Sequence, residues 1–248
     1  MKKALVIGGS NGIGLAIAKK LIDRGYFIEI LDKVSPEADA GLSNTAYRYH
    51  TCDLTRMDSE MIRVLSQDPD IDFLMITAGF GRVTNFENLS LTEIENMILV
   101  NTMAGIKTIS IFYDRLRKDP AFYCGMMGSI AGLISSPMFS VYAASKAAIC
   151  RFIESVNIEL EVNGSANRIL NVSPGSIKGT RFNGGPNDFS QTEQLAEDIV
   201  NHIFARDELF IPDYETVFKG VLERYHTDPH AFGISSYEYK LKSGRVKN

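Results

Sequence analysis

A tyrosine and a lysine four residues apart, with a serine upstream, are the side chains best suited to chemistry. Tyr142 and Lys146 share one face if their segment is a helix. An ammonium near a phenol favours the phenolate and lowers the pKa of the phenol, which makes proton transfer near neutral pH practical. Ser129 follows an apolar run, 13 residues before Tyr142, where its hydroxyl could hold a substrate oxygen. These three residues predict a proton-transfer site.

A glycine-rich turn near the N-terminus is the second candidate site. Glycine permits sharp turns and close approach of a ligand to the backbone. The start of the following helix would offer N–H groups and a positive dipole to a pyrophosphate. The residues predicted to contact such a ligand in this turn are Gly8, Ser10, Asn11, Gly12, Ile13 and Gly14. The alternative is an ordinary tight turn between a strand and a helix.

Asp32 ends the next predicted strand, 18 residues after Gly14. A carboxylate in this place can accept hydrogen bonds from both ribose hydroxyls of an adenosine, and it would repel the additional phosphate of NADP. The sequence therefore favours NAD. NADP stays open because Lys33 could partly offset the repulsion, and Asp32 could also be a solvated strand end.

The elements that would position these residues alternate along the chain. Strands are predicted at 4–7, 27–31, 47–52, 72–76, 122–127, 168–172 and 209–211, and helices at 14–24, 90–118, 142–161 and 191–206. This alternation predicts an α/β fold, a Rossmann-type doubly wound parallel sheet of about seven strands with helices on both faces. We expect a single domain over 1–248, with a substrate loop at about 175–191 and a polar, Tyr-rich tail at about 213–248.

Composition and charge exclude several classes of protein. Of the 248 residues, 45% are hydrophobic and 23% are charged, which argues against a disordered chain. The net charge of −4, without a basic run, disfavours nucleic acid and anionic membranes as partners. No apolar stretch is long enough to span a membrane. We expect a cytoplasmic protein.

Cysteine and histidine usage predicts neither disulfides nor a metal site. Cys52, Cys124 and Cys150 are an odd and sparse set, typical of reduced, mostly buried thiols. His226 and His230 have helical spacing, but the proline between them argues against a regular helix. Surface histidines are the simpler interpretation, and we expect no metal.

The order and spacing of these motifs resemble the short-chain dehydrogenase/reductase family, in its short single-domain branch, over about residues 4–182. The glycine pattern is matched by Gly8, Gly12 and Gly14, and the Ser-Tyr-Lys set by Ser129, Tyr142 and Lys146. Further matches are Asp53 and Leu54 after the third strand, Ala78 and Gly79 after the fourth, Asn101 in the long helix, and Pro174 and Gly175 after the sixth strand.

The resemblance implies reversible hydride transfer between NAD(H) and a secondary alcohol or ketone as a small-molecule substrate. It implies that Tyr142 exchanges the hydroxyl proton, Lys146 lowers the tyrosine pKa and holds the nicotinamide ribose, Ser129 binds the reacting oxygen, and Asn101 holds a water of the proton relay. The other residues it assigns to the cofactor are Asp53, Leu54, Ala78, Gly79, Pro174, Gly175, Ile177 and Thr180. It also implies a homodimer or homotetramer, formed through the helices that begin near Ser90 and Tyr142.

The chain departs from the family pattern at several positions. Thr77 replaces an asparagine before Ala78, and Ile7 replaces a threonine whose hydroxyl usually braces the glycine loop. Thr180, which the resemblance assigns to the nicotinamide carboxamide, stands one position later than the family's threonine. Lys178 and Arg181 could meet an anionic substrate or be solvated.

Two other functions remain open from the sequence. One is a non-catalytic cofactor-binding regulator on the same fold, which would be expected to lack the tyrosine and lysine. The other is a sugar-nucleotide-modifying enzyme of the longer family branch, whose additional substrate domain 248 residues scarcely allow.

Overall fold

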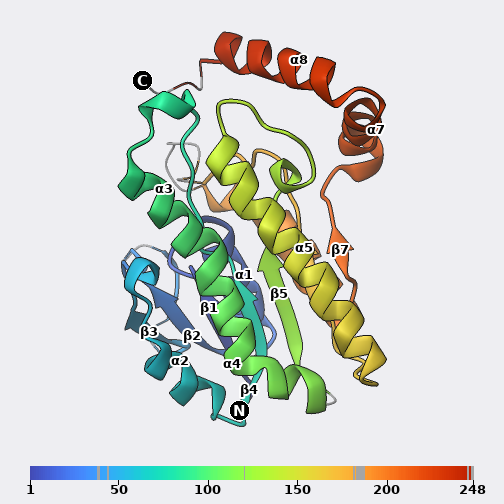
Figure 1. Ribbon diagram of the computed structural model, residues 1–248. Helices are drawn as coiled ribbons and strands as arrows, with labels where there is room; N and C mark the ends of the chain where they lie inside the picture. The colour runs from blue at the N-terminus through green and yellow to red at the C-terminus, as the bar shows by residue number, and fades with distance from the viewer. Residues whose placement is uncertain are drawn as a thin grey trace.

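Short apolar runs form the strands of a central parallel sheet. The computed structural model describes residues 1–37, 40–43, 45–119, 121–180, 182, 188–244 and 246. Within these residues the sheet has seven strands, in the order β3-β2-β1-β4-β5-β6-β7 (Figure 1). The strands are β1 (Lys3–Ile7), β2 (Phe27–Asp32), β3 (Tyr47–Thr51), β4 (Ile71–Ile76), β5 (Tyr123–Met127), β6 (Ile169–Val172) and β7 (Leu209–Phe210). The predicted α/β fold is confirmed.

Helices cover both faces of the sheet because successive side chains of each strand point to opposite faces. Leu5 and Ile7 of β1 pack toward one face, together with apolar residues of three helices. Ala4 and Val6 pack toward the other face. The helices of the first face are α2 (Ser59–Ser66), α4 (Ala104–Lys118) and α5 (Ser140–Val162), and those of the second are α1 (Gly12–Asp23) and α6 (Glu193–Ala205).

The predicted helix over 90–118 is interrupted, and this prediction is corrected. Ser90 caps α3 (Leu91–Ile98) in a capping box with Glu93, as the sequence indicated. A π-helical segment, η3 (Leu99–Met103), then separates α3 from α4. The helix α2, between β3 and β4, was not predicted at all.

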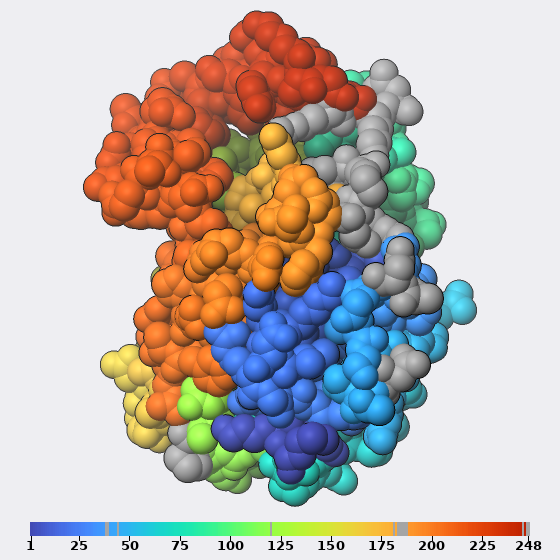
Figure 2. Space-filling model, turned by 180° about the vertical axis from the view of Figure 1, so that it is seen from behind, coloured from blue at the N-terminus to red at the C-terminus, as the bar shows by residue number. Residues whose placement is uncertain are grey.

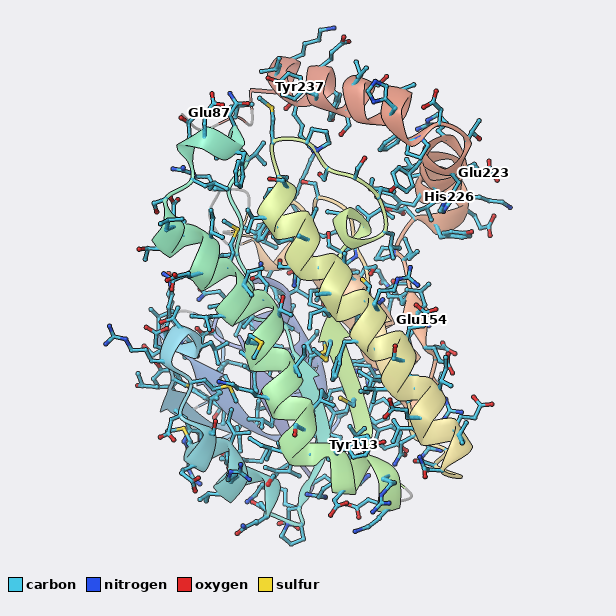
Figure 3. The ribbon with its side chains drawn as sticks, viewed as in Figure 1. Glu87, Tyr113, Glu154, Glu223, His226 and Tyr237 are labelled. Atoms are coloured by element: carbon cyan, nitrogen blue, oxygen red, sulfur yellow. The ribbon has the colours of Figure 1, made fainter. Side chains whose placement is uncertain are left out.

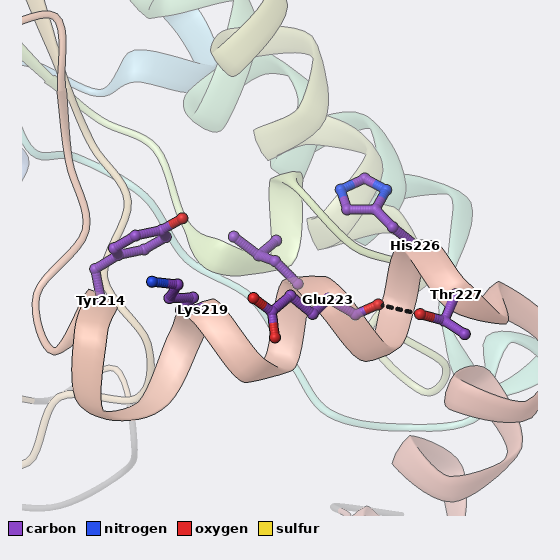
Figure 4. Close-up of a pocket in the computed structure, with 6 residues that line it drawn as sticks. Tyr214, Lys219, Glu223, His226 and Thr227 are labelled. Carbon is purple, nitrogen blue, oxygen red and sulfur yellow. Dashed lines mark hydrogen bonds between the residues drawn. The ribbon is translucent and has the colours of Figure 1, made fainter.

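The polar tail predicted at about 213–248 is mostly helical over the residues that the structure describes. The π-helical segment η7 (Tyr214–Phe218) leads into α7 (Lys219–Thr227) and α8 (Pro229–Lys242). Pro229 starts α8, and the Asp228 side chain caps this helix by accepting from the Ala231 N–H at 2.9 Å. One side of α7 faces a hollow of about 500 Å³, where the Thr227 hydroxyl donates to the Glu223 carbonyl (Figure 4).

The candidate residues gather at one edge of the sheet because the carboxyl ends of parallel strands meet there. Four residues lie just beyond the ends of strands: Gly8 after β1, Thr77 after β4, Ser129 after β5 and Ser173 after β6. Asp32 is the last residue of β2. The helices α7 and α8 arch over this edge (Figures 1 and 2).

The three cysteines are free and buried, as predicted. No helix among the described residues has the length and apolar character that a membrane crossing requires.

Candidate active site

The helix α5 presents Tyr142 and Lys146 to the carboxyl edge of β5. Both side chains are buried, and the Lys146 ammonium lies 5.8 Å from the centre of the Tyr142 ring. The Lys146 Nζ donates to the Met127 carbonyl at 2.7 Å. Ser129 caps a short 3₁₀ turn after β5, and its hydroxyl lies near enough to the Tyr142 phenol to lower the pKa of that phenol. The structure therefore brings the predicted serine, tyrosine and lysine together.

The electrostatics of this group differ from the expectation. Burial raises the pKa of Tyr142 to about 12, and the nearby Ser129 hydroxyl only partly opposes that rise. The sequence predicted a lowered value, because it placed the lysine ammonium beside the phenol. In the structure the ammonium is directed at the Met127 carbonyl, and the loss of water around the phenol dominates. Burial also lowers the pKa of Lys146 to about 8.

We expect the titration of Lys146 to make the free energy of unfolding depend on pH. Its pKa is about 8 in the folded protein against a usual 10.5, so the unfolded chain binds more protons between these values. Raising the pH through this window should therefore stabilise wild type relative to Lys146→Met, by up to about 1.4 kcal/mol per pH unit. Urea unfolding at pH 7 to 10.5 measures the difference. Parallel curves of unfolding free energy against pH for wild type and Lys146→Met would contradict the lowered pKa of Lys146. The control is Lys242→Met, a change at an exposed lysine, whose curve should run parallel to that of wild type.

Asn101 is buried in the π-helical segment η3 and does not face solvent. Its amide accepts from the Phe80 N–H and donates to the Phe80 carbonyl, both at 2.9 Å. It also donates to the Ser145 hydroxyl at 3.0 Å. A Cβ added at Gly79 would lie 3.2 Å from the Lys146 ammonium and 3.3 Å from the Asn101 oxygen, so both groups face the same backbone. Wide helical turns of this kind often occur at functional sites.

The glycine loop is closely packed between β1 and α1. Gly8 has a φ of +84°, and a Cβ there would lie 2.5 Å from the Ala78 nitrogen. A Cβ at Gly14 would lie 2.1 Å from the Gly8 carbonyl oxygen. Only glycine fits both positions, and Ile13 and Gly14 form the first turn of α1 beside them.

Thr77 braces this loop, a role that sequence reasoning missed. Its hydroxyl contacts the Ile7 carbonyl at 3.0 Å and the Gly8 carbonyl at 2.9 Å. Ile7 lacks the hydroxyl that the family's threonine provides, and Thr77 supplies one from the neighbouring strand. The two departures noted in the sequence therefore compensate for each other.

Asp32 faces the glycine loop from the end of β2. Its carboxylate accepts from the Ser10 N–H at 3.1 Å and from the Lys33 N–H at 2.7 Å. Asp53 lies after the neighbouring strand β3 and caps the 3₁₀ turn η1 (Leu54–Arg56). Hydrogen bonds from Thr55 hold the pKa of Asp53 below its usual range. Asp32 is thus more than a solvated strand end, since it helps to fix the loop.

The segment after β6 closes against the glycine loop. The Pro174 carbonyl accepts from the Ile130 N–H at 3.0 Å, beside Ser129. Thr180 is buried, and its hydroxyl donates to the Ile177 carbonyl at 3.1 Å. A Cβ added at Gly12 would lie 3.5 Å from the Thr180 Cβ.

The rest of the predicted substrate loop is placed only in part. Lys178 is exposed, and Arg181 lies outside the described residues. Phe182 packs on Tyr142, with ring centres 5.3 Å apart. Gly175 lies under the Phe218 ring, so the C-terminal segment contacts the strand end directly.

The arrangement of a glycine loop, a buried Ser-Tyr-Lys group and a parallel sheet defines a class of dinucleotide-binding oxidoreductase folds. The family model of the short chain dehydrogenases matches residues 2–190. The chain belongs to this family, as the sequence motifs predicted.

Curated relatives and solved structures agree with this assignment. An uncharacterised oxidoreductase of Saccharomyces cerevisiae is 26% identical over 79% of this chain and 66% of its own length. A dehydrogenase of Cochliobolus heterostrophus is 31% identical over 66% of this chain and 63% of its own length. The match thus spans a little under two thirds of both relatives. A short-chain dehydrogenase from Sphingobium yanoikuyae, solved with NADPH, shares the fold with a TM-score of 0.73, 22% identity, and coverage of 92% and 96% of the two chains.

Proposed function

We propose that the protein interconverts a secondary alcohol and a ketone by hydride transfer with NAD(H). The observation that carries the proposal is the burial of Ser129, Tyr142 and Lys146 at one place, with the Lys146 ammonium 5.8 Å from the centre of the Tyr142 ring and the Ser129 hydroxyl near the phenol. Two hydroxyl groups and a cation that converge in a buried place are suited to hold a carbonyl oxygen and to move a proton to it.

Tyr142 gives a proton to the substrate oxygen in reduction and takes it back in oxidation. A pKa of about 12 in the free protein keeps the phenol protonated at neutral pH, which suits the donating direction. Ser129 donates a hydrogen bond to the same oxygen and orients it. The Asn101 oxygen and the Lys146 ammonium both face the same side of Gly79, where they would pass the proton between Tyr142 and solvent.

The residues at the carboxyl edge fit a nicotinamide dinucleotide. The first turn of α1 exposes backbone N–H groups beside a loop with no room for side chains at Gly8 and Gly14, which is the surface that a pyrophosphate needs. The residues that would hold it are Gly8, Ser10, Asn11, Gly12, Ile13, Gly14, Asp32, Asp53, Leu54, Ala78, Gly79, Tyr142, Lys146, Pro174, Gly175, Ile177 and Thr180. When bound, such a cofactor accepts or supplies the hydride.

A panel of ketones and secondary alcohols tests the reaction, with NADH absorbance as the readout. We expect turnover with at least one ketone and with the matching alcohol in the reverse direction. Binding of NADH without any turnover across the panel would favour the non-catalytic regulator.

A homodimer or homotetramer is proposed as the assembly, and light scattering measures it.

The carboxylate of Asp32 is expected to select NAD over NADP. Wild type should bind NADH at least about tenfold more tightly than NADPH, because the carboxylate repels the additional phosphate. The Asp32→Asn variant keeps an oxygen that can accept a hydrogen bond from the Ser10 N–H, so the glycine loop should keep its conformation. The ratio of NADH affinity to NADPH affinity should become smaller in this variant. Fluorescence titration with both reduced cofactors measures the ratio. Tighter binding of NADPH by wild type would refute this role of Asp32.

A further inference from the structure

The helix α8 contacts the loop that leads into α5 and the candidate tyrosine. In Figure 2 the C-terminal helices form an arch over the carboxyl edge of the sheet, and in Figure 3 Tyr237 marks α8 within it. The Lys240 ammonium donates to the Ser136 hydroxyl and to the Pro137 carbonyl, both at 2.7 Å. Both acceptors lie on the loop, more than 100 residues away in sequence.

Gly233 of α8 also approaches this loop, at van der Waals distance. A Cβ added at Gly233 would lie 3.7 Å from the Ser135 hydroxyl and 4.0 Å from the Pro137 ring. A mainly apolar hollow of about 420 Å³ lies alongside this approach. The hydrogen bonds of a charged donor are therefore the strongest described tie between the helix and the loop.

The residues held by Lys240 form a tight turn with a strained backbone. The Phe139 N–H donates to the Ser136 carbonyl at 3.0 Å and closes the turn. Met138 within it has a φ of +60°, a left-handed conformation that residues with a side chain adopt at a cost in free energy. The Thr84 N–H donates to the Met138 carbonyl at 2.8 Å from the other side. The turn is thus fixed between the loop after β4 and the helix α8.

The turn ends on the ring that supports the tyrosine. Phe139 precedes α5, and its ring stacks on Tyr142 with centres 4.1 Å apart and an angle of 19° between the planes. Gly81 packs directly against both rings, since a Cβ there would lie 2.7 Å from each of them. A shift of the turn would therefore move Phe139 and, with it, the orientation of the Tyr142 phenol.

We infer that Lys240 is a positioning residue for Tyr142, which it orients through the turn Ser136–Phe139. The expected effect of Lys240 on turnover rests on the proposed function. Its effect on the turn Ser136–Phe139 rests only on the contacts described above. It gives the C-terminal helix, which lies beyond the part that the family model matches, a role in the active site.

The experiment compares Lys240→Met with Lys242→Met, a matched change on the same helix at an exposed lysine. We expect Lys240→Met to lower kcat by about ten- to a hundredfold, because small displacements of a catalytic group are costly, while the Kd for NADH stays unchanged. Ser136→Ala, which removes one of the two acceptors, should show a smaller loss. Lys240→Arg should restore part of the rate, and Lys242→Met should match wild type.

Hydrogen exchange supplies a readout that needs no substrate. The amides of 136–143 should exchange about tenfold faster in Lys240→Met than in Lys242→Met, since the turn loses its tie to α8. Unchanged exchange overturns the inference even if the wild-type protein turns over no substrate. Faster exchange with an unchanged kcat, in an active wild type, also overturns it and leaves Lys240 with a structural role only.

Discussion

Tyr142→Phe is expected to reduce turnover by about a hundred- to ten-thousandfold, the usual contribution of a positioned proton donor or acceptor. The change removes one oxygen atom and leaves a ring that can still stack on Phe139 at 4.1 Å and contact Phe182 at 5.3 Å. Cofactor binding should stay within about twofold of wild type, because the glycine loop and Asp32 are untouched. The kcat with an active ketone and the Kd for NADH measure the two effects.

The matched control is Tyr113→Phe, the same change on α4 at the end of the molecule opposite α8 (Figure 3). It should leave kcat unchanged. Near-full turnover of Tyr142→Phe with a reactive carbonyl compound would remove Tyr142 from the mechanism. A loss of NADH binding in this variant would mean that the phenol contributes to holding the cofactor more than to the transfer of the proton.

The sheet was predictable because its signals are local. Runs such as Ala4–Ile7 are apolar and end at glycine, and a buried parallel strand needs nothing more to be recognised. The shared face of Tyr142 and Lys146 follows from helical spacing alone. By contrast, α2 is only eight residues long, which is shorter than the roughly 11–18-residue stretch over which helical periodicity is read, although Ile62 and Leu65 share its buried face. Asp58, which caps it, is the signal that could have revealed it.

The features that the sequence could not show are contacts between distant parts of the chain. Asn101 is a poor residue for a helix interior, yet the Phe80 backbone, 21 residues earlier, satisfies its amide. The hydroxyl of Thr77 acts on β1, which only the sheet order brings next to β4. The pKa of Tyr142 depends on how completely the ring is enclosed, and spacing along one helix carries no information about that. The helix α8 has no amphipathic stripe, so it could not be recognised from periodicity.

Gly14→Ala is expected to weaken NADH binding by more than about tenfold and to lower the free energy of unfolding by about 1–3 kcal/mol, as overpacking does. The added methyl carbon would lie 2.1 Å from the Gly8 carbonyl oxygen and 2.5 Å from the Thr77 hydroxyl. The carbonyl is backbone and cannot rotate away, so the loop must separate from α1. That movement would break the hydrogen bond between Thr77 and Gly8, and with it the surface offered to a pyrophosphate.

The control for Gly14→Ala is Gly220→Ala in α7, where the nearest atom to an added Cβ is the flexible Arg224 Nη1 at 3.6 Å. Alanine favours a helix over glycine by up to about 1 kcal/mol, so this variant should be as stable as wild type or slightly more stable. NADH titration and urea unfolding of both variants separate the two sites. If Gly14→Ala binds NADH as wild type does, the glycine loop is only a tight turn between β1 and α1, and the cofactor must bind elsewhere.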